Sequence, residues 1–432
     1  MKRIVILLLT LTIALFANAQ ENHSSPPSVT LPAAASPAAA SPTERTLRFE
    51  SPSGKVAFLI GVNEQKRLCY SVQYGGKPLL GTAPLGITVD GVDLGADVEL
   101  TGSASPQTVS KTLATPRGVS SQVQVNYCQT RLSLRHASSK IEYSVELRVF
   151  DDGVAFRYVV PGKGVRKISG EATAYQLPEK TLIWGAMGHV CYEGTYICGK
   201  VSGTQKDPRQ LMAPVVFRAA DGEAFGAITE GVLVDYVGHR YQHSGGGLLN
   251  ILFPDEPEFS LSGNIVSPWR VVMTAKNLDG LVNNTVLPGL ATPPSPELLK
   301  ADWIVPSRLG WSWMAGDGAK GVNLENMKRY TDACADLGFE GNLVDEGWSH
   351  WNGGGEKAWA QVKELVDYSN KLGMKTWLWK ACHDRKGIPG LDDPAAKESF
   401  FRRCAELGVV GVKLDFLNSE NLASINFMRD IL

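Results

Sequence analysis

The chain has 432 residues, enough for two or three domains with sizeable cores. Its composition is that of an ordinary soluble protein, with 44% hydrophobic residues, 20% charged residues and a formal net charge of -1. This balance shows no basic excess for nucleic acid and no block of like charges for a membrane surface. We therefore expect a neutral or small-molecule partner.

The first residues have the pattern of a secretory signal peptide. Lys2 and Arg3 give a positive start, residues 4–16 form a short apolar run, and Ala-Asn-Ala provides a cleavage site after Ala19. The apolar run is short for a transmembrane anchor, and no cysteine follows the site as in a lipoprotein. We expect a signal peptide over 1–19, no membrane insertion of the mature chain, and a periplasmic or extracellular location.

Residues 20–44 repeat proline, alanine and serine, so they predict a disordered linker rather than part of a core. The seven cysteines are too few for a disulfide scaffold. Cys191 and Cys198 flank a short segment and could pair in an oxidising compartment. The alternative is that all seven are small buried residues.

Residues 45–287 consist mostly of short runs with the pattern of β-strands. The segment YSVELRVFDDGVAFRYVV places two alternating runs around Asp151, Asp152 and Gly153, which indicates a β-hairpin. No helical period persists over this region, and we predict a large antiparallel β-sandwich as the N-terminal domain. A proline-rich linker, 288–307, separates it from a different pattern.

Helices alternate with short apolar runs from 308 onward. The first helix should begin after Asn323 as N-cap and end at Gly338, with Leu324, Met327, Tyr330, Cys334 and Leu337 on one face. Another should start at Pro394. Leu-Gly ends three successive helices at a constant period of 35 residues, at Gly338, Gly373 and Gly408, and a short apolar run follows each time. This pattern predicts parallel βα units.

A period near 35 residues suits a TIM barrel, whose eight units fill roughly 250 residues. Residues 308–432 would supply its first four βα units, which leaves the barrel incomplete. The fold class expected is therefore multidomain, an antiparallel β-sandwich followed by the first half of a (β/α)8 barrel.

The repeat also selects charged residues. Asp345, Lys380 and Asp415 each stand seven positions after the glycine that ends the preceding helix. Each would lie at the C-terminal end of a strand, which is the face where such barrels build their active sites. Core packing would favour apolar residues at these positions, so we expect the three side chains to meet at one barrel mouth.

Carboxylates at strand ends with nearby tryptophans suit carbohydrate chemistry, because sugars stack apolar C–H faces on indoles and pair hydroxyls with charged groups. Trp348, just past a strand end, is the best stacking candidate, and Trp311 is a second; core packing is the alternative for each. Glycoside cleavage needs two carboxyl groups. Asp415 is the candidate nucleophile, because Lys413 shares its strand face and would keep it ionised, although the pair could be purely structural.

The other charged residues are expected to bind the sugar or to pair with the acids. Asp345 has the inward phase and should hold sugar hydroxyls. Lys380 could pair with either acid or with a hydroxyl. No later residue of the chain stands at a barrel strand end, so we expect the general acid to lie beyond Leu432.

The sequence resembles glycoside hydrolase family 97, over residues 48–432. The resemblance is carried by LRFESPSGKVAFLI, CYEGTY, LGWSWMAG, VDEGW and VKLDF together with the order of sandwich and barrel. The family implies exported bacterial α-glycosidases with an N-terminal supersandwich and a catalytic barrel. Asp415 in VKLDF matches the retaining branch, which is similar to α-galactosidases; the inverting α-glucosidase branch lacks that carboxylate.

The resemblance also implies a calcium ion near the substrate, with Glu193 in CYEGTY matching the ligand from the sandwich; an exposed loop acid is the alternative. Most other calcium ligands and the acid/base glutamate would lie beyond Leu432, so the chain would be truncated within its barrel. The sequence thus predicts a calcium-assisted retaining glycoside hydrolase acting on terminal α-galactosides. Alternatives are an inverting α-glucosidase and a non-catalytic carbohydrate-binding fragment.

Overall fold

In the computed structural model, the described residues are 46–431, except 116–119, 189–194, 205–209, 317 and 386. They all belong to one compact unit of the chain. The predicted signal peptide and the linker over 20–44 lie outside the described residues, as do Glu193 and the proposed disulfide partner Cys191. Among the helices of the described part, none is long and apolar enough to cross a membrane.

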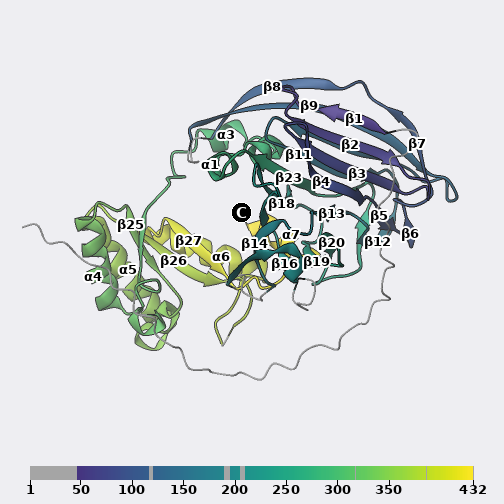
Figure 1. Cartoon of the computed structure of the whole chain (residues 1–432). Helices are drawn as coiled ribbons and strands as arrows, with labels where there is room; N and C mark the ends of the chain where they lie inside the picture. Colours follow the sequence, from purple (N-terminus) through teal and green to yellow (C-terminus); the bar gives the residue numbers. More distant parts are fainter. Residues whose placement is uncertain are drawn as a thin grey trace, which may run out of the picture. The chain divides into compact units, whose positions relative to one another are not determined.

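Two large antiparallel sheets make up most of the N-terminal region (Figure 1). The first is eight-stranded, in the order β1 (Leu47–Glu50), β2 (Val56–Val62), β3 (Leu68–Tyr74), β4 (Lys77–Pro84), β13 (Ala174–Gln176), β20 (Leu248–Leu252), β19 (Arg240–His243) and β16 (Leu211–Met212).

The second sheet is eleven-stranded. Its main path is β15 (Tyr196–Lys200), β14 (Leu182–Ala186), β17 (Val215–Arg218), β18 (Phe225–Gly231), β23 (Trp269–Ala275), β11 (Gly153–Val160), β10 (Glu142–Phe150), β9 (Gln122–His136) and β7 (Val98–Ser103), with β22 (Ile265–Val266) on β11 and β8 (Gln107–Ala114) on β9. The predicted hairpin is confirmed, since β10 and β11 pair with Phe150 opposite Gly153.

A smaller antiparallel sheet of β21 (Phe259–Ser262), β12 (Val165–Glu171), β5 (Ile87–Val89) and β6 (Val92–Asp93) completes the strands of this region. Short helical segments follow or interrupt them: η1 (Val201–Thr204), α1 (Leu278–Val282), α2 (Val286–Leu290) and α3 (Pro296–Leu299).

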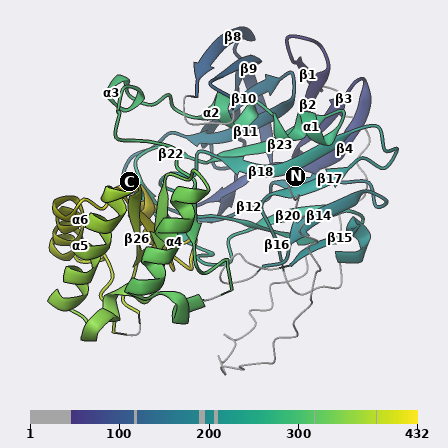
Figure 2. The ribbon, with the colours of Figure 1, turned by 90° about the vertical axis from the view of Figure 1, so that its left-hand side faces the viewer.

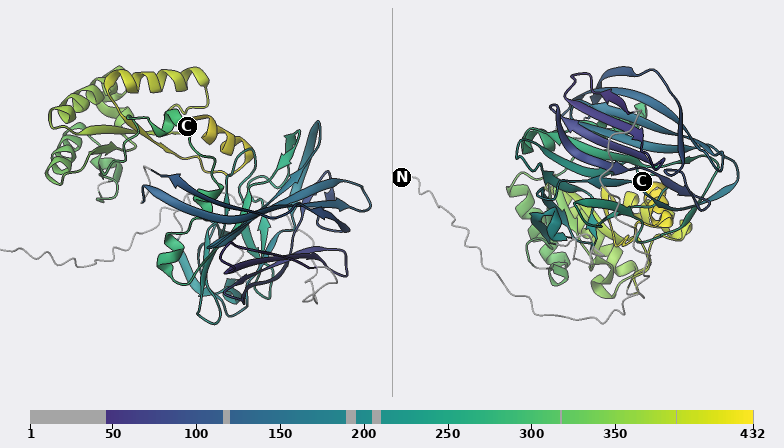
Figure 3. Two further views of the ribbon diagram at one scale, coloured as in Figure 1. Left: turned by 90° about the horizontal axis from the view of Figure 1, so that it is seen from above. Right: turned by 45° about the vertical axis from the view of Figure 1, so that its right-hand side comes forward.

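The core of the sandwich lies between its two large sheets, which occupy different layers in Figure 3. Phe58 on β2 packs against Phe156 on β11 with ring centroids 5.7 Å apart, and both side chains are fully buried. Buried side chains from strands of both sheets form one hydrophobic cluster, so a face of each sheet packs against the other. The β-sandwich prediction is therefore confirmed.

The second region is a four-stranded parallel sheet in the order β24 (Leu309–Trp311), β25 (Gly341–Val344), β26 (Lys375–Ala381) and β27 (Gly411–Asp415). Its helices are α4 (Leu324–Asp336), α5 (Glu356–Lys371), α6 (Pro394–Leu407) and α7 (Leu422–Ile431), with 3-10 turns η2 (Gly318–Gly321) and η3 (Trp348–Gly353). Figure 2 shows α4, α5 and α6 beside the strands. This is the strand–helix alternation of half a TIM barrel, as predicted.

Local sequence accounts for the helix ends. Asn323 caps α4 through its side chain, which accepts a hydrogen bond from the Asn326 N–H, and Gly338 after the helix has a φ of 68°. Asp393 caps α6 ahead of Pro394 in the same way. One member of the predicted α4 face is wrong: Leu337 is 67% exposed, because the helix ends at Asp336 and the last residue turns away from the sheet.

The close packing of β26 against β27 gives a test of the fold. A Cβ on Gly411 would lie 2.4 Å from the indole of Trp377, its paired residue on β26. We expect Gly411→Ala to lower the free energy of unfolding by about 1–3 kcal/mol, since the partly buried Trp377 ring must shift to accept the methyl group.

Gly199→Ala is the matched control, because a Cβ at Gly199 on β15 meets nothing within 4 Å. Urea unfolding followed by tryptophan fluorescence would compare the two. Equal stability of both variants and the unaltered protein would contradict this account of the β26–β27 contact.

Candidate active site

The carboxyl ends of β25 and β27 bring Asp345 and Asp415 to one cluster. The Lys413 amine joins them, lying 3.0 Å from Asp345 Oδ2 and 3.1 Å from Asp415 Oδ2. Asp345 is almost completely buried, whereas the side chains of Lys413 and Asp415 keep 29% and 32% of their surface exposed. One cation therefore serves two carboxylates, and the more exposed carboxylate is Asp415.

Each carboxylate also receives hydrogen bonds from neutral donors. The Trp379 indole Nε1 donates to Asp415 Oδ2 over 2.8 Å, and the Phe416 N–H donates to Oδ1 over 2.9 Å. Asp345 accepts from the Trp311 indole and from the Glu346 N–H. Because these donors come from the neighbouring strands and from the strand ends themselves, the sheet fixes the direction in which each carboxylate points.

These contacts decide the ionisation of Asp415. Burial, the largest influence, raises the pKa of this carboxyl group, but the hydrogen bonds from Trp379 and Lys413, the Lys413 charge and the Phe416 N–H together outweigh it. The pKa of Asp415 is consequently lowered from its usual value. At neutral pH the group is an ionised carboxylate, which is the state a nucleophile requires.

The cluster forms part of the wall of a cavity of about 730 Å³. Trp311, Trp313 and Glu346 line it from the parallel sheet, and Leu233 and Val234 line it from the sandwich. The volume lies within the usual range for small-molecule sites. Both regions of the chain thus contribute to the space in front of Asp415.

The sandwich also holds the loop that follows Asp415. The Asp255 carboxylate accepts from the Glu420 N–H over 2.7 Å, and the Glu256 carboxylate accepts from the Leu422 N–H over 2.8 Å at the start of α7. The Gly238 N–H donates to the Glu420 carbonyl over 2.8 Å. Acidic side chains far away in sequence therefore tie down the backbone beside the candidate nucleophile.

Lys380 does not share the face of the two acids, so the prediction that three charged residues meet at one mouth is wrong for this residue. Leu414 pairs with Lys380, whereas Asp415 pairs with Ala381. Side chains alternate along a strand, so Lys380 points to the helix side of β26, where its amine donates to the Pro389 carbonyl.

The stagger of the strands explains this outcome. Leu343, Trp377 and Gly411 are at one level of the sheet, yet they stand five, four and three residues after their respective glycines. A TIM barrel has a shear of 8 over eight strands, or about one residue per strand. Residues that stand the same number of positions after their glycines therefore lie on opposite faces in adjacent strands and on the same face in alternate strands.

The two predicted sugar-stacking tryptophans, Trp311 and Trp348, lie at different places. Trp311 lines the cavity, and the Lys413 amine lies 4.6 Å from its ring centroid. Trp348 is only 5% exposed; its indole donates to the Trp379 carbonyl over 2.8 Å and packs against Trp359. Since Trp348 is a packed residue outside this cavity, the stacking assignment does not apply to it here.

Trp379 is the functional residue that sequence reasoning missed. It was one of several tryptophans in the barrel region, and only the pairing of Trp379 with Lys413 shows that it faces the acids. Counting with a one-residue slip per strand would have found it. The predicted calcium ligand Glu193 lies outside the described residues, and among those described no group of three or more His, Cys, Asp or Glu side chains could hold a metal ion.

Comparison with known proteins fits this architecture. Residues 49–293 match the model of the glycosyl-hydrolase 97 N-terminal domain, and residues 304–432 match the model of glycoside hydrolase 97. The chain belongs to glycoside hydrolase family 97.

Two curated relatives of this family 97 chain are named α-galactosidases. A "probable retaining alpha-galactosidase" of Streptomyces bingchenggensis is 27% identical over 84% of the chain and 56% of its own length. A "retaining alpha-galactosidase" of Bacteroides thetaiotaomicron is 26% identical over 88% of the chain and 61% of its own length. The chain thus spans less than two thirds of either relative.

Solved structures show the same fold. A β-arabinopyranosidase superposes with a TM-score of 0.78 at 24% identity, covering 89% of the chain and 64% of that structure. A family 97 enzyme of a Pseudoalteromonas species, solved in complex with panose, superposes with a TM-score of 0.75 at 19% identity and the same coverage.

The shared cation makes a prediction for stability. Lys413→Met removes the ammonium group and leaves the buried Asp345 carboxylate without its ion pair. We expect a loss of about 1–3 kcal/mol in unfolding free energy, below the cost of a fully buried pair because Lys413 is partly exposed. Chemical denaturation at neutral pH would measure it.

Lys363→Met is the control, since Lys363 pairs with Asp367 on the surface of α5 and both side chains are about half exposed. Such a pair contributes about 0–0.5 kcal/mol. Similar losses in the two variants would show that the cluster has no special stabilising role.

The hydrogen bond from the Trp379 indole to Asp415 leads to a prediction about the pKa of Asp415 and the pH dependence of stability. Trp379→Phe keeps a ring but removes one donor to Asp415, so the pKa of Asp415 should rise. The interactions that lower this pKa stabilise the fold above the ordinary value of about 3.9 and are lost as pH falls through the folded-state pKa. The variant should therefore lose stability mainly above that value.

Carbon NMR of the Asp415 carboxyl group during a pH titration would measure the pKa directly. Trp303→Phe, at a side chain 74% exposed, is the control and should leave the titration unchanged. An unaltered Asp415 titration in Trp379→Phe would exclude the indole as a significant influence.

Proposed function

We propose that the protein hydrolyses terminal α-galactosides with retention of configuration, and that Asp415 is the nucleophile. The observation that carries the proposal is the ionised Asp415 carboxylate at the end of β27, held by Lys413 and Trp379 at the wall of the large cavity. The names of the two curated relatives favour the α-galactoside over other glycosides.

The first step follows from the geometry of a retaining glycosidase. An Asp415 oxygen attacks the anomeric carbon from the β face as the bond to the leaving oxygen breaks, and a covalent glycosyl ester forms. Water then attacks the same carbon from the α face and gives a proton to the group that had protonated the leaving oxygen, while the bond from the carbon to the Asp415 oxygen breaks and frees the carboxylate. Lys413 and Trp379 orient the carboxylate for attack. They stabilise its negative charge again when the ester is cleaved.

Protonation of the leaving oxygen is assigned to no residue of the described chain. Asp345 is occupied as an acceptor by Trp311, Lys413 and the Glu346 N–H, an arrangement suited to positioning rather than to proton donation. We propose that Asp345 and Lys413 hold sugar hydroxyls and that the Trp311 ring contacts the apolar face of the sugar. Lys380 lies on the opposite face of β26, and Trp348 is packed against Trp359 outside the cavity, so neither takes part in this arrangement.

Calcium remains a proposal that rests on the family resemblance, with Glu193 as the ligand this chain would provide. When bound near the substrate, the ion would supply positive charge to polarise sugar hydroxyls or the leaving oxygen. No step of the mechanism above passes through it. The basic and apolar N-terminal residues support the further proposal that the protein is exported to the periplasm.

An inverting α-glucosidase is the second candidate within the family. It would place a water molecule where Asp415 stands, so the carboxylate on β27 argues against it. NMR of the first-formed anomer, with paired α-galactoside and α-glucoside substrates, separates the two. Release of the α-anomer from the galactoside supports the proposal, and β-glucose from the glucoside supports the alternative.

The nucleophile assignment predicts a chemical rescue. Asp415→Ala in the full-length protein should lower kcat at least roughly 1,000-fold, because the covalent step is lost. Sodium azide should restore part of the turnover by attacking the vacated β face. The product, β-galactosyl azide, is identified by NMR and mass spectrometry.

Asp367→Ala is the control for this experiment, since Asp367 is an exposed acid on α5 away from the cavity. It should retain normal turnover and yield no azide adduct. Normal turnover in Asp415→Ala would exclude Asp415 as the nucleophile, and an absence of turnover on any glycoside by the unaltered full-length protein would favour the carbohydrate-binding alternative.

A further inference from the structure

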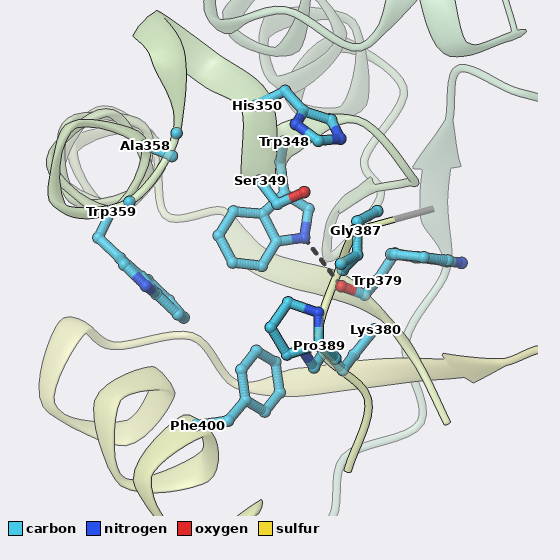
Figure 4. Close-up of a pocket in the computed structure, with 13 residues that line it drawn as sticks. Trp348, Ser349, His350, Ala358, Trp359, Trp379, Lys380, Gly387, Pro389 and Phe400 are labelled. Carbon is cyan, nitrogen blue, oxygen red and sulfur yellow. Dashed lines mark hydrogen bonds between the residues drawn. The ribbon is translucent and has the colours of Figure 1, made fainter. Parts of the chain in front are cut away.

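A second cavity, of about 420 Å³, lies on the helix side of β26. Figure 4 shows it between η3, the start of α5, the end of β26 and α6. Its walls include the rings of Trp348, Trp359, Phe400 and Pro389, with Lys380 and Ser349 among its polar members. Since successive side chains on β26 point to opposite faces, this cavity is distinct from the one in front of Asp415.

Lys380 places a positive charge in this cavity. The residue is only 9% exposed; its amine donates to the Pro389 carbonyl and lies 5.1 Å from the Phe400 ring centroid. Among the described residues it forms no ion pair with a carboxylate. An ammonium group has three donors and the Pro389 carbonyl accepts one of them, so the amine retains donors for a ligand in the cavity.

The ionisation of Lys380 agrees with this environment. Burial, the largest influence, lowers the pKa of the amine, while the charge of Asp384 opposes the shift. The Asp384 carboxylate accepts from the Gly390 N–H through Oδ1, and among the described residues it forms no ion pair with Lys380. A negatively charged ligand in the cavity would therefore provide a counter-ion for Lys380.

Two further groups favour an anion at the same place. The buried Ser349 Oγ has no hydrogen-bond partner among the described residues. Gly354 and Gly355 line the cavity at the start of the 16-residue helix α5, whose N-cap Gly355 provides no side-chain cap. The first N–H groups of a helix lack intrahelical acceptors and carry partial positive charge.

The acid at the start of α5 does not fill this role. Glu356 pairs with Arg403, and the Arg403 guanidinium lies 5.1 Å from the centroid of the Trp359 ring. The Glu356 carboxylate is therefore directed to the surface. The apolar walls, in turn, favour a ligand with a hydrophobic body over a bare inorganic ion.

We propose that this cavity binds a small organic monocarboxylate. The carboxylate lies between Lys380, Ser349 and the first turn of α5, and the apolar body lies against Trp359 and Phe400. The volume is near the lower end of the range for ligand pockets, which suits a ligand with a single ring or a short chain.

Phenylacetate and its neutral counterpart phenylacetamide test the proposal on the unaltered protein. We expect phenylacetate to bind saturably in calorimetry and at least tenfold more tightly than the amide. In nitrogen NMR the indole signals of Trp348 and Trp359 should shift, whereas that of Trp311 in the catalytic cavity should stay in place. Acetate should bind more weakly than phenylacetate, because it lacks the apolar body.

Lys380→Met should remove the preference for the carboxylate, and Lys371→Met, at an exposed lysine on the same helix as Trp359, should retain it. Ser349→Ala should weaken phenylacetate binding several-fold. Equal affinity for the acid and the amide, a shift confined to Trp311, or equal losses in the two lysine variants would overturn the proposal. Should Lys380→Met fail to fold, the comparison of acid and amide on the unaltered protein decides it.

Discussion

Strands β25, β26 and β27 slip by about one residue each relative to the glycines that end the preceding helices. This stagger is a geometric requirement of a closing barrel, and it decides which side of the sheet each side chain occupies. Asp345 and Asp415 come from alternate strands, so the slip between them is two residues and both face the mouth. Lys380 comes from the strand between them and faces the helices. The chemistry of both cavities depends on that single displacement.

Within the mouth, the shared Lys413 ammonium organises the candidate site. Two carboxylates close together would repel each other, and a cation between them offsets that repulsion. Burial divides the roles: Asp345 is almost inaccessible and holds Lys413, while the more exposed Asp415 remains available to a substrate. The indoles of Trp311 and Trp379 add one directed donor to each acid. The same arrangement explains why the candidate nucleophile is ionised despite its partial burial.

Strand β26 connects the two cavities. Its Trp379 side chain donates to Asp415 on one face, while the Trp379 carbonyl accepts from Trp348 beside the second cavity. Lys380, the next residue, is the cation of that second cavity. The sandwich contributes from the other side, through Asp255 and Glu256, which hold the backbone after Asp415. The position of the candidate nucleophile therefore depends on its own strand, on a neighbouring strand and on a separate region of the chain.

The sequence by itself determined the two-part fold, the helix boundaries at Asn323 and Pro394, and Asp415 as a charged residue at a strand end, because alternation, capping residues and a repeat of fixed length are local properties. It also suggested the pairing of Lys413 with Asp415, since the two stand two residues apart on one strand. Only the tertiary structure decided that Lys380 and Trp348 lie outside the catalytic cavity and that Trp379 belongs to it. The physical reason is that register between strands is set by barrel closure and packing, and a slip of one residue reverses the face of every side chain.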